Sequence, residues 1–176
     1  MFINTTIDEP LPDTRTNTGF DEFMKLSEDE RATIGKDMTQ EEKDNIIRVF
    51  AQENVTVKDE ITRSENQTND MLIGNLIDAG DGFHMASGQV KVLQSPGGTQ
   101  ILRFENLDVT NGPDLYVYLA TDTNAKDFVS LGRIKGNIRN QNYPTPENTD
   151  FEKYNTVLIW CQAFSTLFGS SKLSTT

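Results

Sequence analysis

The sequence predicts an all-β sandwich-like domain over residues 78–174, preceded by a short N-terminal α-helical segment. From Gly80 onward, turn signals rich in Gly, Asn, Asp and Pro recur about every 8–12 residues, the spacing of short strands in a sandwich or barrel. The runs between these turns are rich in β-branched and aromatic residues, which favour strands. Before Gly80 the chain instead carries two helix-start signals, so we expect the β-structure in the second half.

The clearest strand is Val157–Cys161, an unbroken apolar run that holds the only Cys and the only Trp of the chain. Such a run is typical of a central strand buried on both faces. Pro144 and Pro146 are expected to break pairing and to force a loop before it. The other expected strands are His84–Leu93, Gln100–Glu105, Leu115–Leu119, Val129–Lys135, Ile138–Tyr143 and Phe164–Leu173.

The first part of the chain divides into a leader and a helical segment. Residues 1–19 mix Pro, Thr, Asn and Asp without periodicity and are expected to form an extended leader. Residues 20–77 are expected to form the helical segment and a linker. Within them, residues 54–70 are interpreted as a linker or a third weak helix. Met71–Ile77 is a short helix or a strand, because periodicity cannot decide over so short a run.

Two helices are predicted, over about residues 28–37 and 40–53. Their starts carry the capping-box spacing, Ser27 with Glu30 and Thr39 with Glu42. The second helix has a broad apolar stripe. The first has a thin apolar face, and Gly35 weakens it by about 1 kcal/mol relative to Ala. Since the pair cannot form a core alone, we expect it to pack on the β-domain or on another chain.

Composition limits the classes of partner. The 176 residues carry a net charge of −11 and have a mean hydropathy of −0.53. An acidic surface repels phosphate backbones and anionic lipid, so nucleic acid and membrane-surface binding are not expected, and solubility alone also accounts for the acidity. No apolar run reaches the roughly 18 residues of a membrane helix, so a membrane would be reached only through an anchor outside this chain.

Location is inferred from sequons. The N-terminus lacks the basic start and apolar stretch of a secretion signal, so the chain is either cytoplasmic or a mature or trimmed form. Asn-x-Thr sequons occur at Asn4, Asn54 and Asn66. Together they favour an extracytoplasmic, glycosylated chain.

A single His and a single Cys exclude several site chemistries. One chain cannot supply a blue-copper site or a four-ligand zinc site from Cys and His, and neither a Cys-x-x-Cys-His haem attachment nor a glycine-rich phosphate loop is present. A hydrolytic His pair could only use His84, so we do not expect an enzyme. Cys161 has three interpretations: a small buried hydrophobe, a redox thiol or haem thiolate ligand, or an intermolecular disulfide.

The remaining candidates surround these two residues. His84 is either a strand-start histidine bonded to backbone or a haem or metal ligand opposite Cys161. Trp160 is expected to face the other side of the sheet from Cys161, and Tyr116 and Tyr118 to share one face, all as packing residues. Four acidic residues could bind a hard cation such as calcium, although no EF-hand spacing occurs: Asp78, Asp81, Asp108 and Asp114.

A series of segments in the second half occurs in a characteristic order. They are Phe83-His84-x-x-Ser87-Gly88, Leu102-Arg103-Phe104, Asn111-Gly112-Pro113-Asp114-Leu115-Tyr116-Val117-Tyr118-Leu119, Leu131-Gly132-x-Ile134-Lys135-Gly136, Gln141-Asn142-Tyr143 and Val157-x-Ile159-Trp160-Cys161-x-x-Phe164-Ser165-x-x-Phe168-Gly169. Over residues 80–173 this series resembles the DM13 domain family, which is described as an electron-transfer domain. The chain departs from the family pattern at Arg139-Asn140, where a glycine is expected, at the Pro144 and Pro146 pair, and at Ser171.

The resemblance implies a β-sandwich of the immunoglobulin-like or dopamine-monooxygenase N-terminal type, in extracellular or membrane-attached proteins. It also implies a redox role for Cys161. Haem is the cofactor that the resemblance suggests, and the residues alone do not decide whether it binds. The expected core-support residues are Phe83, Trp160, Tyr116 and Tyr118. The helical segment lies outside the family domain and resembles its archaeal companions.

Two functions follow as expectations. The first is an extracytoplasmic electron-transfer module centred on Cys161, with a redox or surface protein as partner. The alternative is a non-enzymatic cell-surface interaction or assembly domain whose cysteine is structural. The oligomeric state stays open.

Overall fold

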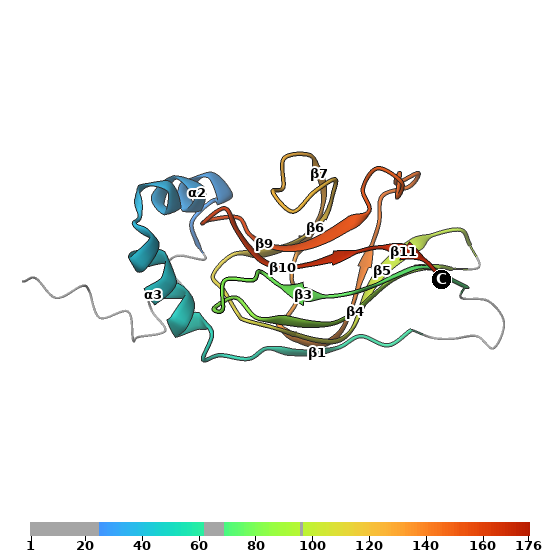
Figure 1. Cartoon of the computed structure of the whole chain (residues 1–176), viewed down its shortest axis with the longest axis horizontal. Helices are drawn as coiled ribbons and strands as arrows, with labels where there is room; N and C mark the ends of the chain where they lie inside the picture. The colour runs from blue at the N-terminus through green and yellow to red at the C-terminus, as the bar shows by residue number, and fades with distance from the viewer. Residues whose placement is uncertain (1–24, 62–68, 96) are drawn as a thin grey trace, which may run out of the picture.

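The computed structural model describes residues 25–61, 69–95 and 97–176. These residues form a β-sandwich of two sheets, with two short helices at one end (Figure 1). The predicted fold class is therefore confirmed. The predicted leader over residues 1–19 lies outside the described residues, as do the sequons at Asn4 and Asn66.

The two sheets contain six and five strands. The first has the order β1-β8-β5-β4-β2-β11, and the second has the order β3-β10-β9-β6-β7. The β1–β8 pair is parallel and the other pairs are antiparallel. The first sheet comprises β1 Thr56–Lys58, β8 Ile138–Pro144, β5 Gln100–Val109, β4 Ala86–Gln94, β2 Asn69–Asn75 and β11 Ser174–Thr175. The second comprises β3 Ile77–Asp78, β10 Thr166–Lys172, β9 Thr156–Cys161, β6 Leu115–Ala120 and β7 Phe128–Arg133.

Each strand predicted from Gly80 onward corresponds to one of β4–β10, with ends that differ by a few residues. β9 lies in the middle of its sheet, as predicted for Val157–Cys161. β5 runs further than predicted, to Val109, and its pairing with β8 shifts register between Phe104 and Leu107. A loop separates β8 from β9, as predicted, but Pro144 itself is the last residue of β8 and pairs with Ile101, so the prediction that it breaks pairing was wrong.

Two stretches of chain pass from one sheet to the other. β2 and β3 are separated only by Leu76, and β10 and β11 only by Leu173. Both leucines are buried in the core between the sheets. Each stretch therefore joins the two layers, and its junction residue fills the space between them.

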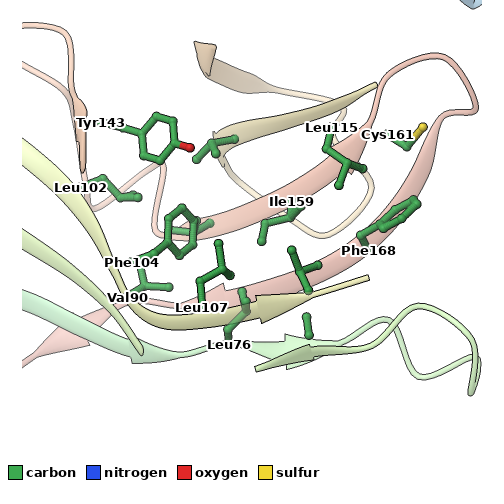
Figure 2. Packing of buried hydrophobic residues seen from close by; sticks show 14 of the residues in the cluster. Leu76, Val90, Leu102, Phe104, Leu107, Leu115, Tyr143, Ile159, Cys161 and Phe168 are labelled. Atoms are coloured by element: carbon green, nitrogen blue, oxygen red, sulfur yellow. The ribbon is translucent and has the colours of Figure 1, made fainter. Parts of the chain in front are cut away.

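The core lies between the sheets. Alternate residues of the paired strands point inward, because successive side chains of a strand face opposite sides. Figure 2 shows Phe104 and Leu102 of β5 in this cluster with Ile159 of β9. Cys161 lies at one edge of the cluster, and its sulfur points away from it (Figure 2).

The helices α2 Glu28–Asp37 and α3 Gln40–Phe50 begin as predicted, each with its capping box formed. They pack on the β-domain, one of the two predicted arrangements. α3 inserts Ile47 and Phe50 into the core. The buried residues of α2 are instead Arg31 and Gly35. The two helices are therefore held by different forces, apolar for α3 and polar for α2.

The predicted linker contributes strands rather than a third helix. β1 pairs with β8, so that Val57 lies opposite Arg139. Just after β1, the Asp59 carboxylate accepts hydrogen bonds from the Asn142 N–H at 3.0 Å and from Lys135 Nζ at 2.5 Å. Met71–Ile77 is also strand, because it falls in β2 and the start of β3. The helical interpretation of Met71–Ile77 was wrong, and in residues 54–70 the described part is β1 and the start of β2 while residues 62–68 lie outside the described residues. Pairing with distant strands overrides weak local preference.

Candidate functional site

Cys161 is the last residue of β9 and has an exposed fraction of 0%. Its backbone is paired with Leu115 of β6 on one side and with Thr166 of β10 on the other. The side chain belongs to the core cluster, whereas Trp160 packs with the cluster on the opposite face of the sheet. The thiol is therefore held by paired strands on both sides.

Backbone N–H groups beside the Cys161 thiol act to lower its pKa. They belong to Phe164, Asp114 and Ala163. Burial raises the pKa of the thiol to about 12, and the charge of Asp114 adds to the increase while these N–H groups oppose it. At neutral pH the group is thus a protonated thiol. The thiolate is the reactive form, so the closed site holds Cys161 in its unreactive state.

The turn that follows Cys161 lies against α2. A Cβ atom built on Gly35 would lie 1.9 Å from the carbonyl oxygen of Ala163 and 3.1 Å from the ring of Phe164. Only a residue without a side chain permits this approach. Gly35, which weakens the helix in isolation, therefore allows α2 to lie on the backbone beside Cys161.

Asp114 is a fully buried carboxylate next to the sulfur. Its Oδ1 lies 3.1 Å from Nε of Arg31 in α2 and 2.6 Å from Nη2 of Arg133 in β7. Its carbonyl accepts the N–H of Gln162 at 2.9 Å, which joins it to the turn after Cys161. A buried carboxylate is tolerated because it is paired with cations. The sulfur, the carboxylate and the two arginines form one cluster.

Tyr116 extends this cluster to the outer face of the second sheet. Its phenol donates a 2.6 Å hydrogen bond to the Glu28 carboxylate of α2. Burial and this bond raise the pKa of Tyr116 to about 12. The Arg133 guanidinium lies 5.1 Å from the ring centre. Tyr116 thus links α2 to the strand next to β9.

The predicted packing residues form an aromatic group on the same outer face. The rings of Tyr116 and Tyr118 are 6.1 Å apart, and Tyr118 stacks on Phe128 at 4.0 Å. Trp160 is partly buried against this group. These side chains cover the outside of β6 and β9, whereas the Cys161 side chain lies on the inside.

His84 is buried in the stretch before β4, with an exposed fraction of 2%. Its Nδ1 lies 2.5 Å from Oδ2 of Asp81, so its partner is a carboxylate and not the backbone that sequence reasoning expected. Its ring packs against Phe168 at 4.3 Å and Phe83 at 4.8 Å, rather than against Cys161. In the described part of the chain, Nε2 has no hydrogen-bond partner. A carboxylate on Nδ1 orients an imidazole as in many metal-binding histidines.

The calcium hypothesis does not fit the structure. Asp78 and Asp81 accept N–H groups of their own turn, from Gly80 and Phe83. Asp108 is exposed on β5, and Asp114 is paired with two arginines. Within the described ranges, His, Cys, Asp and Glu side chains do not gather in threes as a metal site requires. Asp78, Asp81 and Asp114 thus serve turns and ion pairs instead.

A cavity of about 410 Å³ lies elsewhere, on the outer face of the first sheet. Its lining includes Lys58, Asp59, Arg103, Glu105, Arg139 and Asn140. Arg103 is paired with Glu105 at 2.9 Å, so the buried cation of this cavity is already neutralised. Neither Cys161 nor His84 lines it.

Sequence reasoning missed Glu28, Arg31 and Arg133, which look like ordinary surface charges. A signal was available for two of them. Glu28, Arg31 and Gly35 have i, i+3 and i+7 spacing and therefore share one helix face. A helix with a thin apolar face needs another means of attachment, and this face supplies it.

The described residues form two packed β-sheets, and a buried thiol lies at the end of the central strand β9. This arrangement defines the class of protein: a β-sandwich with one cysteine thiol in its interior. The chain belongs to the family Electron transfer DM13, whose model matches residues 79–173. This confirms the predicted resemblance and supports an electron-transfer role. No curated protein and no solved structure matches the chain. The helices α2 and α3 and the strands β1–β3 precede the matched residues.

Two further observations concern membrane-spanning helices and the Asn54 sequon. Among the described residues, no helix is long and apolar enough to cross a membrane. Asn54 is exposed, and its Oδ1 accepts a hydrogen bond from Asn137 at 2.9 Å. A glycan would be attached through Nδ2, so this bond leaves the sequon chemically free to carry one.

Proposed function

We propose that the protein is an extracytoplasmic electron-transfer module whose redox centre is Cys161. The observation that carries the proposal is the enclosure of the buried Cys161 thiol, whose pKa the backbone N–H groups of Phe164, Asp114 and Ala163 lower against the effect of burial. Hydrogen bonds to sulfur are a principal means by which proteins set the potential of sulfur centres. A cysteine that only fills space needs none of them.

A lone thiol exchanges electrons in pairs through a disulfide. The Cys161 thiolate attacks one sulfur of a partner's disulfide, the partner's S–S bond breaks, and a mixed disulfide forms. The departing sulfur leaves as a thiolate and takes up the proton that Cys161 released. In this step the Cys161 sulfur is oxidised into the mixed disulfide, and the departing sulfur is reduced to a thiol. The partner class is therefore a protein or small molecule that carries an accessible disulfide.

Haem fits the closed site poorly. The sulfur has no exposed surface, and Gly35 leaves no space between α2 and the turn beside it. His84 is a separate candidate ligand, because its ring packs on Phe83 and Phe168 and its buried Nε2 has no hydrogen-bond partner among the described residues. We therefore assign the redox step to the thiol and derive none through haem.

The test measures adduct formation on the folded protein. We expect oxidised glutathione to add one thiol to the wild type, seen as a mass increase, and to leave Cys161→Ser unchanged. The rate should rise about tenfold per pH unit between neutral pH and pH 9, because the thiolate fraction rises below the pKa of about 12. Absence of an adduct under conditions where the fold persists contradicts the redox role. A haem titration followed near the Soret band checks the cofactor separately.

Complete burial of Cys161 favours the second candidate, a surface interaction or assembly module with a structural cysteine. In that case Cys161→Ala should keep the fold and any binding activity, and no adduct should form. Extracytoplasmic location is supported by the sequons. Intact mass of protein from its native source, before and after glycosidase treatment, tests it, and an unchanged mass contradicts glycosylation.

A further inference from the structure

We propose that α2 is a lid over Cys161, hinged at the break between α2 and α3 and closed by the Arg31–Asp114 ion pair. This inference rests on the proposed function in treating Cys161 as the reactive group. The movement of the helix, however, can be tested without any electron transfer.

One face of α2 makes the contacts. Glu28 accepts a hydrogen bond from the phenol of Tyr116, and the side chain of Gln162 also lowers the pKa of this carboxylate. One turn on, Arg31 pairs with Asp114, and one further turn on, Gly35 lies on the backbone of Ala163. Glu28, Arg31 and Gly35 thus contact the β-domain one after another along a single face of α2.

These points are the surroundings of the sulfur. The backbone N–H groups of Asp114 and Ala163 act on the pKa of the Cys161 thiol, and Gln162 is its neighbour in the chain. α2 therefore packs directly on residues that surround the Cys161 thiol. Figure 1 shows the β9–β10 connection reaching α2 at the helical end of the sandwich.

Beyond the hinge, α3 and the residues that follow it are anchored to the β-domain. In α3, Ile47 is fully buried, and Met38 at the helix break packs against the same core. After α3, the carbonyl of Glu53 accepts from Asn111 at 2.9 Å and β1 joins the sheet. In α2, by contrast, Ile34 is 44% exposed. Since α2 buries no large apolar side chain, it can leave without opening the core.

Asp114 remains paired when the lid opens. Arg133 lies on β7, outside the moving helix, at 2.6 Å from the same carboxylate oxygen. Removal of Arg31 therefore leaves no unpaired buried charge, the usual obstacle to breaking a buried ion pair. Arg31 itself moves into water. Water and a partner disulfide then reach Cys161, and the thiol ionises more readily because its burial is relieved.

The experiment follows the reaction of Cys161 with an aromatic disulfide reagent that releases a coloured thiolate. Arg31→Ala removes the ion pair, and Gly35→Ala favours the helix itself but forces it off Ala163. We expect each variant to react at least about tenfold faster than wild type. Lys36→Ala, an exposed basic position on the same helix, is the matched control and should react within about twofold of wild type.

Urea distinguishes lid opening from unfolding. Lid opening exposes little surface, so the reaction should respond weakly to low urea, whereas global unfolding would make it rise steeply. The lid is refuted if neither variant reacts faster than wild type, or if the faster reaction has the urea dependence of global unfolding. Faster reaction of both variants without any adduct from oxidised glutathione would retain the lid and reject the redox role. Equal adduct rates in all variants would retain the redox role and reject the lid.

Discussion

Arg139 occupies the position where the family resemblance led us to expect a glycine, and the backbone gives the reason. Its φ is 81°, in the left-handed region that glycine adopts without strain. The residue is paired with Val57 of β1 and with Leu107 of β5, next to the register shift in the β5–β8 ladder. A side chain at such a position costs about 1–2 kcal/mol, so the departure at Arg139 stores strain where three strands meet.

Replacing Arg139 by glycine should therefore stabilise the protein. We expect Arg139→Gly to raise the free energy of unfolding by roughly 0.5–1 kcal/mol, after the greater flexibility of the unfolded chain is subtracted. Arg139→Ala is the matched control, because it removes the same side chain but keeps a Cβ at positive φ, and it should bring no gain. Urea unfolding followed by circular dichroism measures both. Equal changes in the two variants would contradict an origin in backbone strain.

At the scale of elements, the two helices have similar lengths and capping but different anchors. α3 buries Ile47 completely, and Ile46 and Phe50 also pack in or against the core. α2 leaves Ile34 exposed and relies on Glu28, Arg31 and Gly35. We therefore expect α3 to unfold together with the sandwich, and α2 to be able to leave the sandwich without unfolding it.

A pair of matched isoleucine variants tests this contrast. Ile47→Ala should lower the free energy of unfolding by about 2–5 kcal/mol, because it leaves a cavity in the core. Ile34→Ala, the same change on the neighbouring helix, should cost less than about 0.5 kcal/mol. Both values come from urea midpoints at a constant slope. Similar losses at the two positions would show that α2 is anchored as firmly as α3.

At the scale of the whole molecule, carboxylates tie α2 and β1 to the sandwich and cap α3. The Lys135 ammonium lowers the pKa of Asp59, which also accepts the Asn142 N–H. The Tyr116 phenol lowers the pKa of Glu28, and the Thr39 N–H lowers that of Glu42. Each pKa is lower in the folded than in the unfolded state. Their contributions to stability are therefore complete above the ordinary values of 3.8 for Asp and 4.5 for Glu, and are lost as the pH falls further.

Acid should consequently weaken the fold from about pH 4.5 downward. We expect the urea midpoint to be nearly constant above this pH and to fall steadily toward pH 3. Neutralising carboxylates also relieves the repulsion of the net charge of −11, so the wild-type curve contains two opposing effects. Asp59→Asn isolates the loss of carboxylate bonds, because its amide side chain is not protonated in this pH range. The urea midpoint of this variant should therefore fall less steeply with decreasing pH than that of the wild type. Parallel curves for the two proteins would exclude Asp59 as a contributor.

Features that depend on neighbouring residues could be predicted from the sequence. The capping boxes at Ser27 and Thr39 and the buried strand Val157–Cys161 formed where expected. Capping involves residues three apart, and the pattern of a buried strand needs only its own side chains. Cys161 was selected because the chain has one thiol. The strand β1 was not recognised and β2 was left open between helix and strand, because their pairing partners in β8 and β4 lie far along the chain.

The sequence by itself thus determined a β-sandwich of the DM13 family with a lone thiol on its central strand. The tertiary structure decided the state of that thiol. Its burial, the N–H groups around it and the carboxylate beside it come from segments that meet only in the folded chain. Gly35 illustrates the physical reason: helix propensity counts it as a local cost, whereas its value lies in a backbone contact with Ala163 that no local rule contains.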